Sequence, residues 1–148
     1  MLLNQLQSDL KTAQLDRNEI KVSTLRLLLS EIKYAQIAKN VEELADADII
    51  SIVQREIKKR KEAIVGFRSG SREESAQKEE AEQKVLETYL PVQLTTEELT
   101  KIVEQTINEV GASSVTDMGK VIGLVMGKVK GQADGGSVSS IVKEKLAR

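Results

Sequence analysis

A run of evenly spaced glycines between residues 117 and 138 limits most strongly what this chain can fold into. The segment reads DMGKVIGLVMGKVKGQADGGSV and has glycine at every fourth position, at 119, 123, 127 and 131. Apolar residues at helical spacing fill the positions between the glycines, so the segment predicts a helix. Because each glycine inside a helix costs about 1 kcal/mol relative to alanine, three in one helix indicate that the bare surface they form has a use.

Two interpretations of this glycine stripe are open. Residues four apart lie close together around a helix, so the glycines form one narrow strip without side chains. A neighbouring helix could pack tightly against the strip, as small residues allow at close helix crossings. Alternatively, the phosphate backbone of a nucleic acid could approach it, since Lys120, Lys128 and Lys130 surround it.

The rest of the chain also carries apolar residues at helical spacing, and no segment has the alternating pattern of a strand. Residues 2 to 15 predict the first helix. Later boundaries are predicted from capping and terminating residues. Asp16 is predicted to cap a second helix. A third helix is predicted to start between Ala45 and Asp48 and to end at Gly70. Ser71 and Glu74 predict a capping box for a fourth helix, which runs to about Tyr89.

The only proline, Pro91, divides the chain into two predicted domains. Residues 90 to 94 are expected to form a linker. After the linker, Thr95 and Glu98 predict a capping box that starts a helix, and Gly111 is predicted to end it. The glycine-striped helix is predicted to have Ser114 as its cap and Gly131 as its end. Asp134 is predicted to cap the last helix. We therefore expect an all-α protein, with an N-terminal bundle of about four helices in residues 1–90 and a smaller three-helix domain in residues 91–148.

The composition excludes several kinds of chemistry. The 148 residues include no cysteine and no histidine, which removes disulfides, thiol nucleophiles, imidazole bases and the usual zinc sites. Aromatic residues make up only 2%, so base stacking on aromatic side chains is nearly excluded. No apolar run reaches the ~20 residues of a membrane span, and no secretory signal is found. We expect a cytoplasmic protein with no cofactor, no metal and no membrane partner.

Charge is distributed unevenly along the second predicted domain. Residues 91–117 contain one lysine against five acidic residues, whereas residues 118–148 contain six basic against two acidic ones. A local excess of positive charge beside exposed glycine backbone and a helix N-terminus predicts a phosphate-binding surface. The alternative is that lysines late in a helix complement its dipole. The basic residues are Lys120, Lys128, Lys130, Lys143, Lys145 and Arg148.

A second basic cluster lies in the predicted third helix, where five of the seven residues from Arg55 to Lys61 are basic. It is either a ridge that faces RNA or an ordinary solvated face. Arg60 falls within the apolar arc of this helix, so we expect it either to extend its charged end to the surface or to pair with a carboxylate. Glu79 and Glu82 of the polar fourth helix are interpreted as surface charges.

Four motifs carry a family resemblance over essentially the whole chain. They are TLRLLLSEIK (24–33), IKKRKEAI (57–64), YLPVQL (89–94) and KGQADG (130–135), in this order. In these motifs the sequence resembles the GatB/YqeY family, and in particular its stand-alone YqeY-like members. Those members are similar along their length to the C-terminal tail region of the GatB subunit of the tRNA-dependent amidotransferase.

The resemblance implies an all-helical protein whose C-terminal domain contacts tRNA without carrying out chemistry. At the family level it implies carbon–nitrogen ligase activity with glutamine as amido-N-donor. The tail's RNA-facing motif matches Gly119, Lys120, Lys130, Gly131 and Gly135, with Asp134 as a structural cap. The charge distribution adds Lys128 and Lys143 to these predicted nucleic-acid-binding residues.

No set of catalytic residues accompanies the resemblance. A glutaminase needs a cysteine, or a serine held in a Gly/Ser-rich scaffold, and an acyl-phosphate step needs a phosphate-binding loop. Cysteine is absent, the serines at 113–114 and 139–140 lack a glycine-rich context, and no GxxxxGK[ST] motif is present. The leading prediction is a non-catalytic protein that binds tRNA or another structured RNA. The alternatives are a helical protein–protein adaptor and an accessory subunit of an amidotransferase acting in trans.

Overall fold

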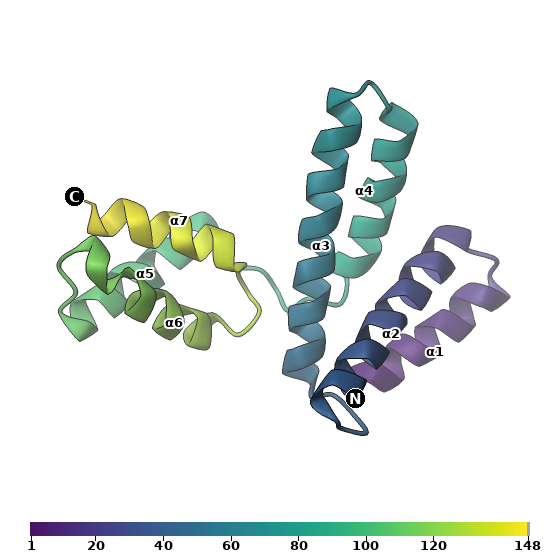
Figure 1. Ribbon diagram of the computed structural model, residues 1–148, viewed down its shortest axis with the longest axis horizontal. Helices are drawn as coiled ribbons and strands as arrows, with labels where there is room; N and C mark the ends of the chain where they lie inside the picture. Colours follow the sequence, from purple (N-terminus) through teal and green to yellow (C-terminus); the bar gives the residue numbers. More distant parts are fainter. Residues whose placement is uncertain (148) are drawn as a thin grey trace. The chain divides into compact units, whose positions relative to one another are not determined.

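The computed structural model describes residues 1–147, and every element in that range is helical (Figure 1). It contains seven α-helices and one short 3-10 helix, and no strand occurs among the described residues. The predicted all-α class is therefore confirmed. The chain divides into two compact units, Met1–Leu90 and Pro91–Arg148.

Four helices form the first unit and three α-helices form the second. The first unit consists of α1 (Leu2–Leu15), α2 (Glu19–Lys39), α3 (Asp46–Ser69) and α4 (Glu73–Glu87). The second consists of α5 (Thr96–Val110), the 3-10 helix η1 (Val115–Asp117), α6 (Met118–Val129) and α7 (Gly135–Leu146).

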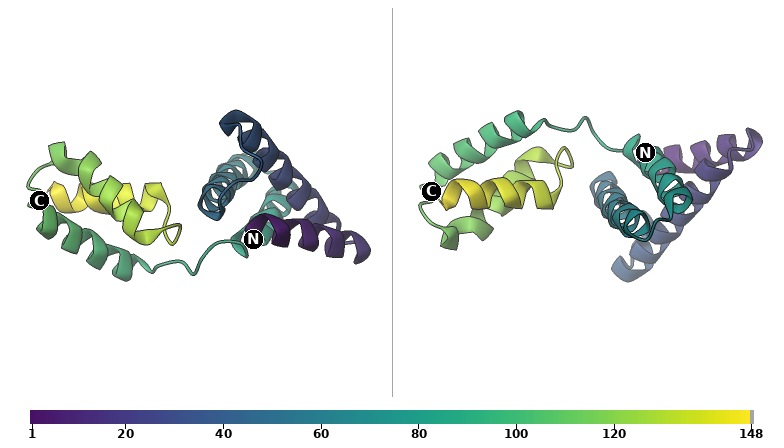
Figure 2. Two further views of the ribbon diagram at one scale, coloured as in Figure 1. Left: turned by 90° about the horizontal axis from the view of Figure 1, so that it is seen from below. Right: turned by 90° about the horizontal axis from the view of Figure 1, so that it is seen from above.

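The first unit is built from two helical hairpins. Helix α1 runs back along α2, and α3 runs back along α4 (Figures 1 and 2). One face of α2 is buried in the core, because Leu25, Leu28 and Ile32 are each at most 1% exposed. Leu6, Ile49 and Val53 of the neighbouring helices complete an almost entirely aliphatic core, as the low aromatic content requires.

A buried ion cluster crosses the hairpin of α3 and α4. Arg60 donates from Nη1 to Glu56 Oε2 at 2.9 Å, and its Nε lies 3.4 Å from Glu82 Oε2. Pairing with a carboxylate, one of the two expectations for Arg60, is therefore confirmed. The interpretation of Glu82 as a surface charge is wrong, because packing of α4 against α3 places its carboxylate beside the buried guanidinium.

The first inter-helix turn differs from its predicted form. Asp16 is the C-terminal cap of α1 and does not cap α2. Arg17 takes the left-handed conformation with φ 56°, and Asn18 caps α2 by accepting a hydrogen bond from Lys21 N. The N-terminal cap of α2 is therefore Asn18, two residues after the predicted Asp16.

The turn between α3 and α4 also differs from its prediction. Gly70 has φ −91°, and Ser71 takes the left-handed conformation with φ 59°. Arg72 N donates to Phe67 O and Ser71 N donates to Arg68 O, the two hydrogen bonds of a Schellman motif. Ser71 is therefore a terminator of α3, and the predicted capping box of Ser71 with Glu74 does not form.

The predicted boundaries of the second unit agree more closely with the structure. Thr95 and Glu98 form the expected capping box of α5, and Gly111 ends that helix with φ 67°. Ser114 precedes η1 and makes no capping hydrogen bond, so α6 begins later than predicted, at Met118. Valine dominates the core of this unit, which contains Val103, Val121, Val125, Val129, Val138 and Val142.

Candidate nucleic-acid interface

Helix α6 has one buried face and one bare face. Val121, Val125 and Val129 are fully buried against α5 and α7. The opposite face is exposed, and a Cβ added at any of its three glycines would meet nothing within 4 Å. The interpretation of the stripe as a helix-packing device is therefore wrong for the described residues, since no helix covers Gly119, Gly123 or Gly127.

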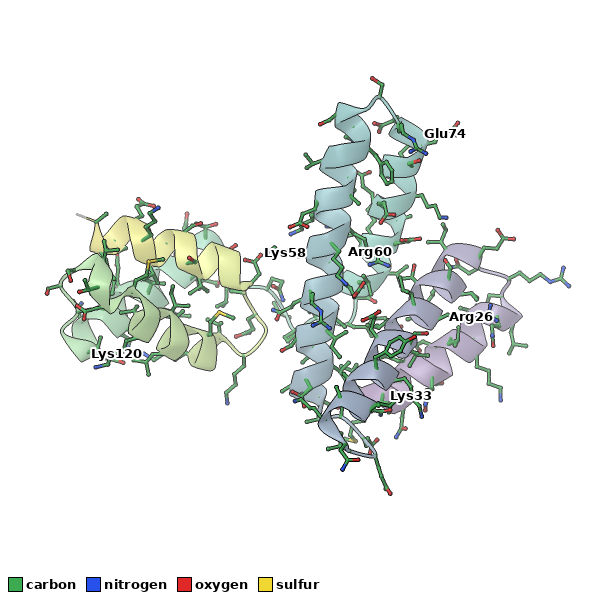
Figure 3. The ribbon with its side chains drawn as sticks, in the orientation of Figure 1. Arg26, Lys33, Lys58, Arg60, Glu74 and Lys120 are labelled. Carbon is green, nitrogen blue, oxygen red and sulfur yellow. The ribbon has the colours of Figure 1, made fainter. Side chains whose placement is uncertain are left out.

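Two side chains accompany the exposed glycines. Lys120 is exposed, and it makes no ion pair with any residue that the structure describes (Figure 3). Leu124 is 42% exposed, which is high for a leucine in a helix that carries a unit's core. The bare face of α6, defined by Gly119, Lys120, Gly123, Leu124 and Gly127, thus combines accessible backbone, one positive charge and one apolar side chain.

Lys128 differs from Lys120 because its charge is compensated within the unit. Its Nζ donates to Glu109 Oε2 at 2.7 Å and to Thr106 Oγ1 at 3.0 Å, both on α5. A lysine held in this way attracts an external phosphate less than an unpaired one. Sequence spacing did not reveal this pair, because Glu109 and Lys128 are brought together only by packing of α5 against α6.

The loop after α6 presents a second lysine in an unusual backbone conformation. Lys130 is the C-terminal cap of α6 with φ 43°, and Gly131 follows with φ 85°. Two successive left-handed residues turn the chain sharply, and the φ of Gly131 favours glycine. Lys130 is exposed at this turn.

The linker motif holds this loop in place. Leu94 N donates to Gln132 O at 2.9 Å, and Gln93 Nε2 donates to Gly131 O at 3.0 Å. Ala133 is buried in the core of the unit, which anchors the other end of the loop. The YLPVQL and KGQADG motifs therefore contact each other, and Gln93 is a residue of the site that the sequence analysis did not single out.

Asp134 caps α7 as predicted, since its Oδ1 accepts from Ser137 N at 2.6 Å. Gly135 is the first residue of α7 and has open space where a Cβ would stand. The first N–H groups of a helix have no intrahelical acceptor and favour an anion. The carboxylate of Asp134 at the same helix end opposes that preference, so Gly135 is a weaker candidate than Lys130.

The remaining basic residues of the second unit divide into paired and unpaired ones. Lys145 Nζ lies 2.7 Å from Glu104 Oε1. Lys143 is exposed in the last turn of α7, with no ion pair to a described residue, and it lies on a different helix from the bare face of α6. Arg148, which the charge argument included, lies outside the described residues.

The basic residues of the α3 cluster are exposed with one exception already described, Arg60, and this exposure is expected for a ridge that faces RNA as well as for a solvated face. Arg55, Lys58 and Lys61 are exposed, and Lys58 is labelled in Figure 3. Lys59 Nζ lies 3.2 Å from Glu56 Oε1. The five basic residues of this segment therefore have three different environments.

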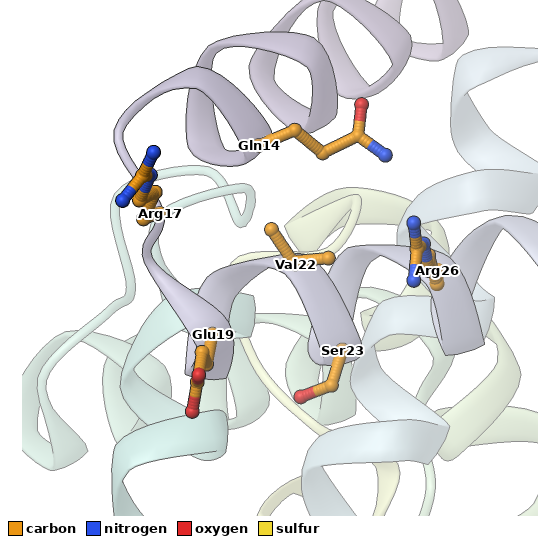
Figure 4. Close-up of a pocket in the computed structure, with 6 residues that line it drawn as sticks. All are labelled: Gln14, Arg17, Glu19, Val22, Ser23 and Arg26. Atoms are coloured by element: carbon orange, nitrogen blue, oxygen red, sulfur yellow. The ribbon is translucent and has the colours of Figure 1, made fainter.

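The first unit also has an open cleft of about 660 Å³ at the turn between α1 and α2 (Figure 4). Its lining includes Arg17, Ser23 and Arg26, and Ser23 donates its hydroxyl hydrogen bond to Ile20 O at 3.1 Å. The hydroxyl proton of Ser23 is therefore directed at a backbone carbonyl in the part of the chain that the structure describes. Among the described residues no acidic cluster could hold a metal ion, and no helix is long and apolar enough to cross a membrane.

The fold and the site define an all-helical protein of two compact units, one of which exposes glycine backbone beside unpaired lysines. A family model described as Yqey-like protein matches residues 3–146, so the chain belongs to this family. The YqeY-like part of the resemblance found in the sequence is thereby confirmed.

Curated relatives of the chain come from fungi. The protein named altered inheritance of mitochondria protein 41, mitochondrial, of Pyrenophora tritici-repentis is 31% identical over 153 residues, which cover 97% of this chain and 80% of the relative. Proteins of the same name from Vanderwaltozyma polyspora and Kluyveromyces lactis are 35% and 34% identical, over 57% and 59% of this chain. The chain matches about half of the length of these two, 46% and 49%.

These names contradict the cytoplasmic location expected from the sequence, because the relatives are named as mitochondrial proteins. The expectation was based on the lack of a membrane span and of a secretory signal. Neither property distinguishes the cytosol from the interior of an organelle, so neither could support it.

Proposed function

We propose that this chain is a non-catalytic RNA-binding protein that uses the bare face of α6 and the adjoining loop. The observation that carries the proposal is the open glycine stripe: three helical glycines face open space next to unpaired Lys120. Bare helical backbone allows a sugar–phosphate chain to approach more closely than any side chain would permit. Structured RNA is recognised largely by its shape and backbone, which suits a surface without aromatic side chains.

The unpaired lysines set the expected strength and salt dependence of binding. Lys120, Lys130 and Lys143 are the exposed lysines of α6, the loop and α7 without an ion pair to a described residue. Three phosphate contacts predict an affinity that falls about forty-fold between ~50 and ~200 mM salt. Binding to unmodified tRNA transcripts, measured by fluorescence anisotropy at both salt concentrations, tests this value.

Charge-reversal variants locate the site. Replacing Lys120 and Lys130 together by glutamate should weaken tRNA binding by more than ten-fold and lower the salt slope by about two contacts. Lys101→Glu at an exposed position of α5 reverses one charge away from the proposed surface and serves as the control for each single reversal, Lys120→Glu and Lys130→Glu. Equal losses in the control and in the two single reversals would contradict a local site and indicate only a general effect of net charge.

Glycine variants separate backbone approach from charge. Gly119→Ala, Gly123→Ala and Gly127→Ala meet no atom within 4 Å, so each should raise the stability of α6, by up to about 1 kcal/mol. If RNA approaches the helix backbone, the triple alanine variant binds tRNA more weakly although it is more stable. Unchanged affinity in a stabilised triple variant would remove the stripe from the binding site.

The relation to the GatB tail and to the amidotransferase belongs to the same proposal. It rests on the motifs YLPVQL and KGQADG, whose residues contact each other in the loop described above. An accessory role in trans predicts that the tagged chain co-purifies with amidotransferase subunits in a tRNA-dependent manner. Retention of the subunits after ribonuclease treatment would instead indicate direct protein contact.

A protein–protein adaptor is the second candidate, and the exposure of Leu124 beside the glycines favours it. An interface of this kind is mainly apolar and releases few counterions, so its affinity changes little with salt. Absence of tRNA binding at ~50 mM salt, together with a salt-insensitive protein partner lost in Leu124→Asp, would support the adaptor over the RNA-binding protein.

A further inference from the structure

Helix α2 carries an apolar seam on the side that faces away from the core of its unit. Leu27, Tyr34 and Ile37 are 46%, 69% and 68% exposed. With Ser23 and Ser30 these residues follow steps of four and three, the spacing of the a and d positions of a coiled coil. We refer to the set Ser23, Leu27, Ser30, Tyr34 and Ile37 as the α2 seam.

The α2 seam has no partner within its own unit. The core of the first unit is formed by the opposite side of α2, where Leu25, Leu28 and Ile32 are buried. Three of the chain's large exposed apolar side chains, Leu27, Tyr34 and Ile37, lie on this one line. An unpaired seam with a 3.5-residue period is the surface that a second helix with the same period covers.

The charges beside the α2 seam are self-complementary. With Leu27 and Tyr34 as the a positions, Arg26 occupies a g position and Glu31 the following e position. In a parallel pair of helices each g residue faces the e residue five positions later in the other chain. Arg26 of one copy would therefore meet Glu31 of the other, twice across the interface.

We propose that the α2 seam is an interface between two copies of this chain, arranged in parallel and in register. An antiparallel pairing of the same seam would bring Glu31 close to Glu31, which like charges disfavour. The exposed positions of Arg26 and Lys33 along α2 are visible in Figure 3. Tyr34 in the α2 seam is of the type enriched at protein interfaces.

The size of the α2 seam limits the strength of the dimer. Three large apolar side chains on about four helical turns bury less area than a standard stable interface. We therefore expect a reversible dimer that forms at roughly 100 µM and above. Sedimentation velocity of the full chain from ~10 µM to ~2 mM measures this equilibrium.

Two variants with equal exposure test the location of the interface. Ile37→Asp places a charge in the α2 seam and should weaken the dimer by about ten-fold or more. Val65→Asp on α3 alters a side chain of equal exposure, 67% against 68%, and should leave the dimer unchanged. A wild-type chain that stays monomeric at ~2 mM, or equal effects of the two variants, would overturn the proposal.

Exchanging the charges of Arg26 and Glu31 tests whether the partner at the α2 seam is a second copy of this chain. Arg26→Glu and Glu31→Arg should each weaken the dimer, because each leaves like charges facing each other across the interface. The double exchange should restore the dimer, since the glutamate introduced in one copy then meets the arginine introduced in the other. Only a second copy of this chain gives that restoration. Failure of the double exchange to recover the wild-type dimer would contradict the proposed pairing.

A single thiol tests the direction of the helices. The chain has no cysteine, so Ser23→Cys introduces its only thiol near the start of the α2 seam. In the parallel arrangement the two thiols meet and oxidation links the dimer covalently, whereas an antiparallel pair separates them by about 21 Å along the helix. Ser51→Cys, exposed on α3, is the control that should not link. A dimer whose Ser23→Cys chains fail to link would overturn the parallel arrangement.

Discussion

At the scale of single residues, several polar side chains are buried in this protein beside a hydrogen-bond acceptor or an opposite charge. Thr24 and Thr106 are buried and donate to the carbonyls of Ile20 and Ile102, each at 2.7 Å. Arg60 is buried beside carboxylates. Such groups contribute little net stability when paired, but an unpaired partner left behind is costly.

The high cost of leaving a buried charge unpaired predicts the effect of Arg60→Met. The variant leaves the largely buried carboxylate of Glu82 without its cation, and leaves that of Glu56 with the exposed Lys59 alone. We expect it to lower the free energy of unfolding by about 3 to 5 kcal/mol, measured by urea denaturation followed by circular dichroism.

Replacing Arg60, Glu56 and Glu82 together by apolar residues of similar size is the control. Because no charge is then left unpaired, the triple variant should be close to wild type in stability, or above it. A triple variant as unstable as Arg60→Met would show that the loss comes from packing and not from the charges.

Tyr89 makes the folding stability of the protein depend on pH in the alkaline range. Its hydroxyl donates to Asp9 Oδ2 at 2.6 Å, and burial, together with this bond, raises the pKa of Tyr89 above its ordinary value of 10.0. Since the folded state holds the phenolic proton more tightly, this contribution is fully present below pH 10 and is lost as pH rises above it. Stability should therefore fall with pH above about 10.

Tyr89→Phe tests this pH dependence. At pH 7 the variant should lose about 1 to 2 kcal/mol, because it lacks the bond to Asp9. Above pH 10 its stability should decline less steeply than that of the wild type, as measured by urea denaturation at several pH values. Tyr34→Phe, at an exposed tyrosine, is the matched control and should leave the pH dependence unchanged.

At the scale of elements, the helix ends decide where the second unit presents its backbone. Asp134 starts α7, the left-handed Lys130 and Gly131 end α6, and Gln93 holds the loop between them. The capping box of Thr95 with Glu98 starts α5 directly after the linker. These local hydrogen bonds place the loop of the candidate interface at a fixed position in its unit.

The capping box predicts a measurable difference between two adjacent threonines. Thr95→Ala removes the acceptor of Glu98 N and should destabilise the second unit by about 1 kcal/mol. Thr96→Ala lies one residue later, inside the helix, where alanine is favoured, so it should be neutral or stabilising. Thermal unfolding of the full chain with both variants measures the difference, and equal effects would contradict the role of the cap.

At the scale of the whole molecule, the chain consists of two units that have separate cores. The core of Met1–Leu90 consists mainly of leucine and isoleucine, and that of Pro91–Arg148 mainly of valine. A core completed within each unit predicts that each unit folds without the other, including the smaller one of about 60 residues.

Fragments test this independence. Residues 1–90 and 91–148 expressed separately should each unfold cooperatively, and their summed far-ultraviolet circular dichroism should equal that of the full chain. An unfolded 91–148 fragment would contradict the prediction. That outcome would also restrict RNA-binding experiments to the full chain.

Much of the fold could be predicted from the sequence because its signals are local. The helical periods, Thr95 with Glu98, Gly111 and Asp134 were recognised, since each acts on residues within one helical turn. The local patterns predicted the wrong residue in two turns where neighbouring residues are both suited to a helix end. Asp16 was expected as the cap that Asn18 forms, and Gly70 was expected as the terminator that Ser71 provides. In both turns a residue other than glycine took the left-handed conformation, which sequence preferences disfavour.

The sequence by itself determined that this protein is helical, where most helices begin and end, and that its cores are aliphatic. Only the tertiary structure decided that the glycine stripe is open and that the α2 seam is uncovered. It also decided that Lys128 and Arg60 are paired while Lys120 is not. The reason is physical: exposure and ion pairing depend on residues far apart in the chain, such as Glu109 and Lys128. The approach of such residues is set by the packing of whole helices and not by any local preference.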